Sequence, residues 1–214
     1  MSLALHDGRN LLAEMTWHTE NNHTTELAPA IRDLLARCQI TIADLTALGV
    51  SIGPGSFTGL RIGVALAKGI ASARELPLVG VSTLDTLAAG QPQHVHHALI
   101  AVVEAGRGRI IAATYRWSQG SWVKRGDPQL MNWESLFASI DGPAYITGAI
   151  SEEGFISFIQ AQAQEIPVKL APAAQRLRRA GFVAEVALER LNAGEEDFHP
   201  SRLTPLYVKT RDIP

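Results

Sequence analysis

The chain has 214 residues, of which 46% are apolar and 19% charged, so it can bury a core and is not expected to be disordered. Nineteen Lys and Arg against 21 Asp and Glu give a net charge of −2, which excludes the basic excess of a stand-alone nucleic-acid-binding protein. A single cysteine, Cys38, excludes an intrachain disulfide and a zinc site built from cysteines. No apolar run reaches the ~20 residues of a membrane span, and the first ten residues lack the basic stretch of a secretory signal. The sequence therefore predicts a cytoplasmic protein with no membrane segment.

The first half of the chain predicts a hairpin followed by alternating helices and strands. Asp7-Gly8 between two apolar runs is typical of a hairpin turn. Apolar residues at helical spacing then end at Cys38, and a later strand leads into a glycine-rich turn that opens a second helix. The predicted strands are residues 2–6, 11–17, 47–52 and 76–81. The predicted helices are residues 24–38, a helix that follows the turn at 53–59 and reaches about residue 73, and residues 83–89.

The second half repeats this order after a polar segment, residues 91–97, which is the predicted boundary. Its predicted strands are 98–103, 109–117, 121–124, 144–147 and 168–171, and its predicted helices are 132–140, 152–163 and 173–192. Although no sequence repeat is visible, each half places strands first and then helix–strand–helix, which indicates a duplicated α/β fold. We therefore expect a first subdomain at 1–97, a second at 98–202, and a tail at 203–214 that returns to the first.

The glycine-rich segment Gly53–Gly59 allows two interpretations. The residues after its last glycine do not fit a Walker loop, and its spacing fits neither a nucleophile elbow around Ser56 nor a dinucleotide fingerprint. A strand that ends in such a turn and opens a helix can hold an anion on its bare amides, here at Gly53, Gly55 and Ser56. The alternative is a tight strand-to-helix turn with no ligand.

The helix after this turn carries small residues every four positions, at Gly59, Gly63, Ala67 and Ala71. Such a ridge lets another helix approach closely. Ile62, Leu66 and Ile70 form a second apolar row on the same helix. One row can pack on the sheet, and the other requires a different partner unless the helix that ends at Cys38 covers it completely. We therefore predict an intermolecular helix contact at Leu27, Ile31, Leu34, Leu60, Gly63, Val64, Ala67 and Ala71.

The run 53–63, GPGSFTGLRIG, resembles the signature of the TsaB family, also called YeaZ. Further agreement comes from Thr25–Pro29, Pro77–Ser82 and Pro205–Lys209, so the resemblance covers most of the chain. It implies an actin-like ATPase (ASKHA) fold with two similar subdomains of mixed sheet and helices.

The resemblance also implies a role and partners. TsaB proteins are non-catalytic subunits of the bacterial machinery that places a threonylcarbamoyl group on the adenine beside the anticodon of tRNA. Such a subunit binds the catalytic TsaD through its first two helices, forms homodimers through the same surface, and is joined by the ATPase TsaE. Contact with tRNA would be indirect, and no cofactor is expected.

Two departures from the family pattern affect these expectations. The family opens with an apolar strand ending in Asp-Thr-Ser, which this sequence lacks, so we expect the first strand of subdomain one to be missing beside residues 47–52. Two explanations are open: a start upstream of Met1 that would restore the strand, or an altered first subdomain. In the sequence as given, two strand edges would lose their partner, and ATP binding in the usual cleft is not expected. The second subdomain opens with Glu104-Ala105-Gly106-Arg107-Gly108 in place of Asp-Ala-Arg-Arg-Gly.

The alternative function is a peptidase-like or ATPase-like enzyme of the same fold. A His-x-x-x-His pair would mark a metal site, but none of the seven histidines are four apart. The one histidine cluster, His94, His96 and His97, lies in the polar segment with no acid or cysteine nearby. The sequence therefore predicts neither a metal site nor catalytic residues.

Overall fold

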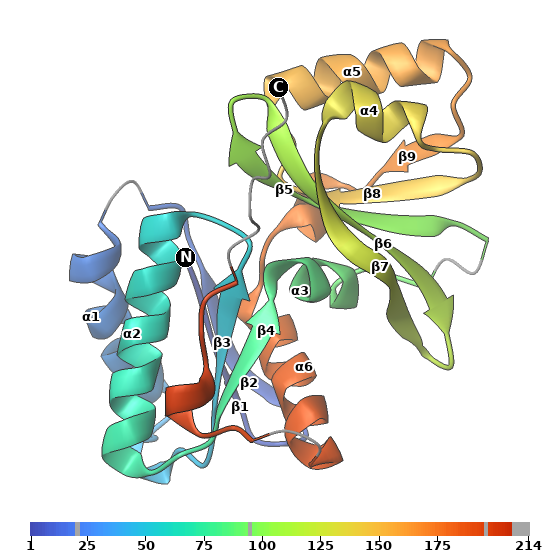
Figure 1. Cartoon of the computed structure of the whole chain (residues 1–214). Helices are drawn as coiled ribbons and strands as arrows, with labels where there is room; N and C mark the ends of the chain where they lie inside the picture. Colours follow the sequence, from blue (N-terminus) through green and yellow to red (C-terminus); the bar gives the residue numbers. More distant parts are fainter. Residues whose placement is uncertain (20–21, 94–95, 195–196, 207–214) are drawn as a thin grey trace. The chain divides into compact units, whose positions relative to one another are not determined.

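The computed structural model of the chain describes residues 1–19, 22–93, 96–194 and 197–206. Within these ranges the contacts divide the chain into two compact units (Figure 1). Unit 1 consists of Met1–Ser82 with Arg179–Leu206, and unit 2 begins at Thr83 and extends to Arg178.

Unit 1 has helices on both sides of two separate pairs of strands. Strands β1 and β2 form an antiparallel hairpin, and β3 and β4 form a parallel pair. Helix α6 packs against all four strands, whereas α1 packs on β1 and α2 on β3 and β4. The elements are β1 (Ser2–His6), β2 (Leu11–Thr16), α1 (His23–Arg37), β3 (Leu48–Gly53), α2 (Phe57–Arg74), β4 (Leu78–Ser82) and α6 (Ala180–Ala193), with 3-10 turns at Ile42–Asp44 and Pro200–Arg202.

Unit 2 is built on one five-stranded sheet in the order β7-β6-β5-β8-β9. The central strand β5 is antiparallel to β6 and parallel to β8, and its residues alternate between two buried clusters. One cluster includes residues of α3, and the other includes residues of α4 and α5. The elements are α3 (Thr83–Ala89), β5 (Ala98–Gly106), β6 (Arg109–Ser118), β7 (Ser121–Asn132), α4 (Trp133–Ala138), β8 (Ala144–Gly148), α5 (Glu152–Ala163) and β9 (Val168–Leu170), with a 3-10 turn at Ala173–Arg176.

The contacts differ from the predicted subdomains 1–97 and 98–202 at two elements. Helix α3 packs its apolar side on β5 and so belongs to unit 2, because Leu84 and Leu87 join the core there. Helix α6 belongs to unit 1, where Ala187 packs with Val79 and Val81 of β4.

The long helix predicted at 173–192 is also corrected. Residues Ala173–Arg176 form a 3-10 turn, and the extended backbone of Leu177 and Arg179 separates this turn from α6. In the predicted tail, Leu203 is buried with α2 and Leu206 donates its amide to the Ile52 carbonyl at 2.7 Å, so both lie in unit 1. Residues 207–214 lie outside the described residues.

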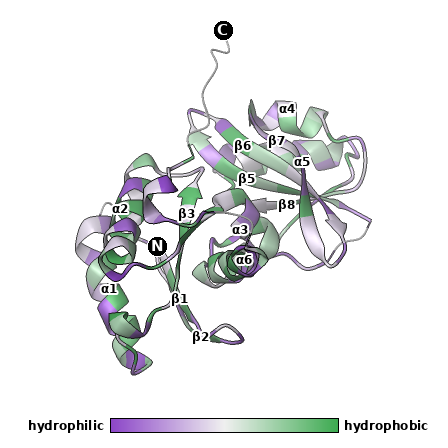
Figure 2. Cartoon of the chain, turned by 60° about the horizontal axis from the view of Figure 1, so that its bottom comes forward, coloured by the Kyte–Doolittle hydropathy of each residue, from purple (hydrophilic) through white to green (hydrophobic). Residues whose placement is uncertain are grey.

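In the part of the chain that the structure describes, none of the helices combines the length and the hydropathy needed to cross a bilayer. Apolar residues lie on α1 and α2 as well as on the strands (Figure 2).

Candidate partner-binding surface

The glycine-rich turn joins β3 to α2 and is closed by contacts within unit 1. Gly53 has a φ of +108°, which favours glycine, and a Cβ there would lie 3.0 Å from the Leu206 carbonyl oxygen. Ser56 caps α2, because its hydroxyl accepts a hydrogen bond from the Gly59 amide at 3.3 Å. These contacts fit the interpretation as a strand-to-helix turn. Anion binding at Gly53, Gly55 and Ser56 stays a prediction.

Three of the predicted partner-binding residues lie in the core of unit 1. Val64 and Ala71 of α2 are 4% and 0% exposed and pack with Leu76, Leu78 and Leu203. Leu34 of α1 is buried with residues of β1. These side chains hold α1 and α2 against the strands and are not available to a second protein in this structure.

The other five predicted residues remain half-exposed, together with the second apolar row of α2. Gly63 lies open, since no atom comes within 4 Å of the position that its Cβ would occupy. Near the start of α2 the helices are closer, because a Cβ at Gly59 would lie 3.3 Å from the His23 ring of α1. We define the α1–α2 surface by these half-exposed residues: Leu27, Ile31, Leu60, Ile62, Gly63, Leu66, Ala67 and Ile70.

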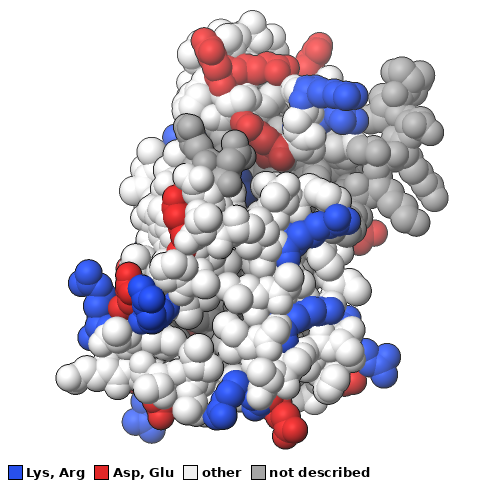
Figure 3. Space-filling model, turned by 90° about the vertical axis from the view of Figure 1, so that its left-hand side faces the viewer, with Lys and Arg blue, Asp and Glu red and all other residues white. Residues whose placement is uncertain are grey.

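The α1–α2 surface has few charges of its own. Figure 3 views the molecule from the side on which α1 and α2 lie, and it shows Lys, Arg, Asp and Glu spaced around an area of uncharged residues. Phe57, at the start of α2, is an exposed apolar residue that the sequence did not predict to be functional. This side chain is 54% exposed at the first turn of α2, with the Arg61 guanidinium 3.8 Å from its ring centroid.

A charge-assisted hydrogen bond joins the first turn of helix α1 to Trp17, the residue after β2. The Trp17 indole N–H donates to the Glu26 carboxylate at 2.8 Å. This hydrogen bond is the largest cause that lowers the pKa of Glu26 below its ordinary value. The ionised form of Glu26 therefore stabilises the first turn of α1.

We expect acid to weaken this attachment. Because the pKa of Glu26 is lowered in the folded state, its stabilisation is present above the ordinary pKa of a glutamate and is lost as the pH falls through the lower folded value. Glu26→Gln lacks this titration, so its thermal midpoint should fall less between pH 6 and pH 3.5 than that of the unaltered protein. Circular dichroism melts of both proteins provide the measurement, and parallel pH dependences would contradict the assignment.

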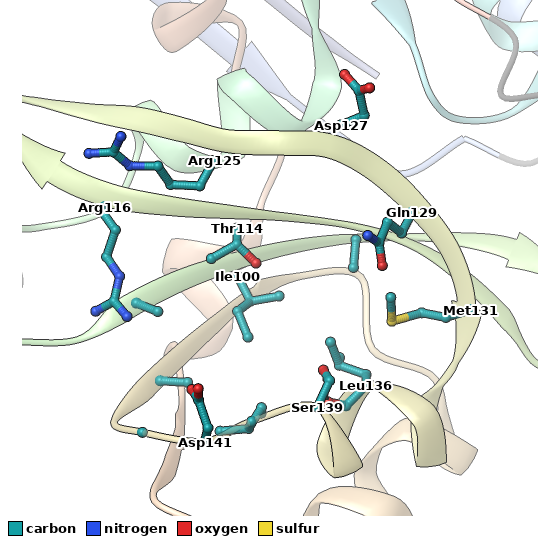
Figure 4. A pocket seen from close by; sticks show the side chains of 15 residues that line it. Ile100, Thr114, Arg116, Arg125, Asp127, Gln129, Met131, Leu136, Ser139 and Asp141 are labelled. Atoms are coloured by element: carbon teal, nitrogen blue, oxygen red, sulfur yellow. Dashed lines mark hydrogen bonds between the residues drawn. The ribbon is translucent and has the colours of Figure 1, made fainter.

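Unit 2 contains a cavity of about 180 Å³ on the face of its sheet beside α4 (Figure 4). Ile100, Ala112 and Ala144 form part of its apolar lining, and no histidine or cysteine is among its lining residues. Its polar lining residues are Thr114, Arg116, Arg125, Asp127, Gln129, Ser139 and Asp141. Among the described residues, no group of three or more His, Cys, Asp or Glu is placed to hold a metal ion, and His94 of the histidine cluster lies outside those residues.

The two units, each with helices against its own mixed set of strands, define an α/β protein of the actin-like ATPase fold class. A family model described as "TsaD: tRNA N6-adenosine threonylcarbamoyltransferase" matches residues 11–198. Within this group of proteins, the chain belongs to the TsaB (YeaZ) family, which confirms the resemblance noted in the sequence.

Individual relatives agree with this assignment. The tRNA threonylcarbamoyladenosine biosynthesis protein TsaB of Bacillus subtilis is 32% identical over 69% of this chain and 66% of its own length. TsaB of Escherichia coli is 39% identical over 47% of this chain and 44% of its own length. The chain thus spans less than two thirds of either relative. The solved structure of YeaZ from Pseudomonas aeruginosa has the same fold, with a TM-score of 0.76 at 24% identity over 97% of this chain and 93% of that one.

Proposed function

We propose that this chain is a non-catalytic subunit in the biosynthesis of threonylcarbamoyladenosine in tRNA, and that it binds and activates a TsaD-type catalytic subunit. The α1–α2 surface is the single observation that carries this proposal. Its eight half-exposed residues include no charged side chain and extend over two adjoining helices. Contiguous apolar surface of this kind marks protein–protein interfaces.

The structure behind this surface also supports a docking role. Leu34, Val64 and Ala71 hold both helices against the strands of unit 1, so the half-exposed residues of the α1–α2 surface lie on a packed core. A stable interface buries about 800 Å² on each partner, so further residues of these helices of 15 and 18 residues would have to contribute beside the α1–α2 surface. A second copy of the chain could use the same surface. TsaE would join this pair, and tRNA would be contacted indirectly.

Reconstitution tests the proposal. The purified chain is mixed with TsaD from the same organism, and complex formation is followed by size-exclusion chromatography with light scattering. We expect a heterodimer and, after TsaE, tRNA, ATP and a donor of the threonylcarbamoyl group are supplied, modified tRNA at a rate that depends on the chain. A chain that stays separate from TsaD, or that leaves the rate unchanged, would refute the role.

An enzyme of the same fold is the second candidate, since the matching family model describes a transferase. The chain alone would then hydrolyse ATP or a peptide, and the activity would fall on Ser56→Ala or Glu104→Gln. We expect no activity above the buffer control.

A further inference from the structure

Helix α5 has large apolar side chains on the side that faces away from the sheet of unit 2. Its inner side packs on the core through Phe158, and Ala161 is buried there. On the outer side, Ile156 and Ile159 are 52% and 64% exposed, and 64% is the largest exposed fraction among the exposed large apolar residues of the described ranges. Figure 1 shows α5 beside α4, and no helix or strand of unit 2 within the described ranges lies over its outer side.

The two isoleucines form one row along the helix. With 3.6 residues per turn, they lie about 60° apart around the axis and about 140–160° from the buried Ala161. Phe155 lies at the side of this row and is 38% exposed. A surface helix ordinarily has polar residues on its outer side, so packing on the core does not account for this row. Adjoining exposed apolar side chains of this kind mark interaction sites.

A contact within unit 2 holds Phe155 at the side of the row. The guanidinium carbon of Arg176 lies 5.2 Å from the Phe155 ring centroid, in a cation–π arrangement. The Nε atom of Arg176 is buried, so this side chain lies against the helix and does not extend over the isoleucines. We define the α5 row by Phe155, Ile156 and Ile159.

The chain segment that contains the α5 row is acidic. Residues 126–168, which include α4 and α5, have no Lys, Arg or His, although the whole chain has 19 Lys and Arg. Every carboxylate of this segment is exposed, and in the described part of the chain none of them forms an ion pair. These carboxylates belong to Asp127, Glu134, Asp141, Glu152, Glu153 and Glu165. The segment therefore concentrates negative charge in a chain whose net charge is only −2.

Charge decides between the possible occupants of an apolar helix side. A second copy bound through the same row would bring two acidic surfaces together, which is unfavourable. RNA and the anionic surface of a membrane are also negatively charged and would be repelled. A protein helix with Lys and Arg beside apolar side chains is attracted to this segment and can cover the isoleucines.

We propose that the α5 row is a docking site for a basic amphipathic helix of another protein, separate from the α1–α2 surface. Ile156 and Ile159 would pack against the apolar side of that helix, and Glu152, in the first turn of α5, would pair with its Lys or Arg. One helix side of this size lies at the low end of interface areas, below about 1,200 Å² in total, so we expect a weak and salt-dependent association.

A peptide of lysine and leucine, LKKLLKLLKKLLKL, is the probe, because its helix has one basic and one apolar side. It is titrated into the 214-residue chain labelled at the isoleucine methyl groups, and the methyl signals are followed by NMR. We expect the signals of Ile156 and Ile159 to shift, and the affinity to fall about fivefold or more between 50 and 300 mM salt. The same peptide with glutamate in place of every lysine is the matched control, and it should bind at least about tenfold more weakly.

Ile159→Lys should weaken binding of the lysine peptide by about tenfold or more, because it removes an apolar contact and repels the lysines of the peptide. Ser121→Lys is the matched control, since it adds the same charge at an exposed position of unit 2 outside residues 126–168, and its affinity should stay within about threefold of the unaltered protein. Both positions are exposed, so both variants should keep the thermal midpoint within about 2 °C.

Equal affinities of Ile159→Lys and Ser121→Lys would overturn the proposal, as would methyl shifts confined to Ile62 and Ile70 of the α1–α2 surface. Equal binding of the lysine and glutamate peptides would show that charge does not select the occupant. A dimer of the chain alone that Ile159→Lys dissociates would identify a second copy as the occupant, and sedimentation of the chain with phosphatidylglycerol vesicles would identify a membrane. Either of these results would contradict docking of a basic helix.

Discussion

Gly63→Arg is expected to weaken binding to a TsaD-type subunit by about 100-fold or more while leaving the monomer folded. Gly63 lies on the α1–α2 surface with open space around its Cβ position, so unit 1 can accept the longer side chain. Arginine also favours a helix over glycine by up to about 1 kcal/mol. In a complex, the guanidinium would be buried among apolar groups without a partner, which costs several kcal/mol, and each 1.4 kcal/mol is a tenfold loss of affinity.

Ala65→Arg is the matched control for this variant. Ala65 is an exposed residue on the same helix, and the two-residue step places it about 200° around the axis from Gly63. It adds the same charge outside the α1–α2 surface, so its affinity should stay within about threefold of the unaltered protein. Calorimetric titration with TsaD measures both variants, and circular dichroism verifies their folding. Equal affinities for the two variants would place the interface elsewhere.

The sequence predicted the type of nearly every element, because turn residues and hydrophobic spacing are local signals. The sequence could not predict which of the small residues on α2 are buried and which stay open. Gly63 and Ala71 belong to the same row of small residues spaced every four positions, yet Gly63 is open and Ala71 is fully buried. The difference arises because Ala71 meets Leu76, Leu78 and Leu203, and such contacts depend on the path of the helix over β3 and β4.

The division into units depended on contacts between residues distant in sequence. Helix α6 carries the apolar pattern of any amphipathic helix, and that pattern does not show which unit its apolar side covers. Its position is fixed by contacts such as those of Ala180, whose amide donates to the Ser2 hydroxyl at 2.8 Å across 178 residues. Likewise, Phe57 belongs to the quoted sequence motif, but its exposure depends on how the turn presents the first residues of α2.

Gly148→Ala is expected to destabilise unit 2 by about 4 kcal/mol or more, a large part of the 5–15 kcal/mol that stabilises a typical domain. Gly148 ends β8 with a φ of +115°, which L side chains rarely adopt, and a Cβ there would lie 2.0 Å from the Val102 carbonyl oxygen of β5. Because the obstacle is the backbone of the central strand, no rotation of a side chain can relieve the overlap, and β5 and β8 must separate.

Urea unfolding monitored by fluorescence measures the loss of stability, since Trp133 is 2% exposed in the same core. Gly142→Ala is the control, because its Cβ would meet nothing within 4 Å, and it should change the unfolding free energy by less than about 0.5 kcal/mol. A Gly148→Ala midpoint equal to that of the control would show that the two strands can adjust at this position.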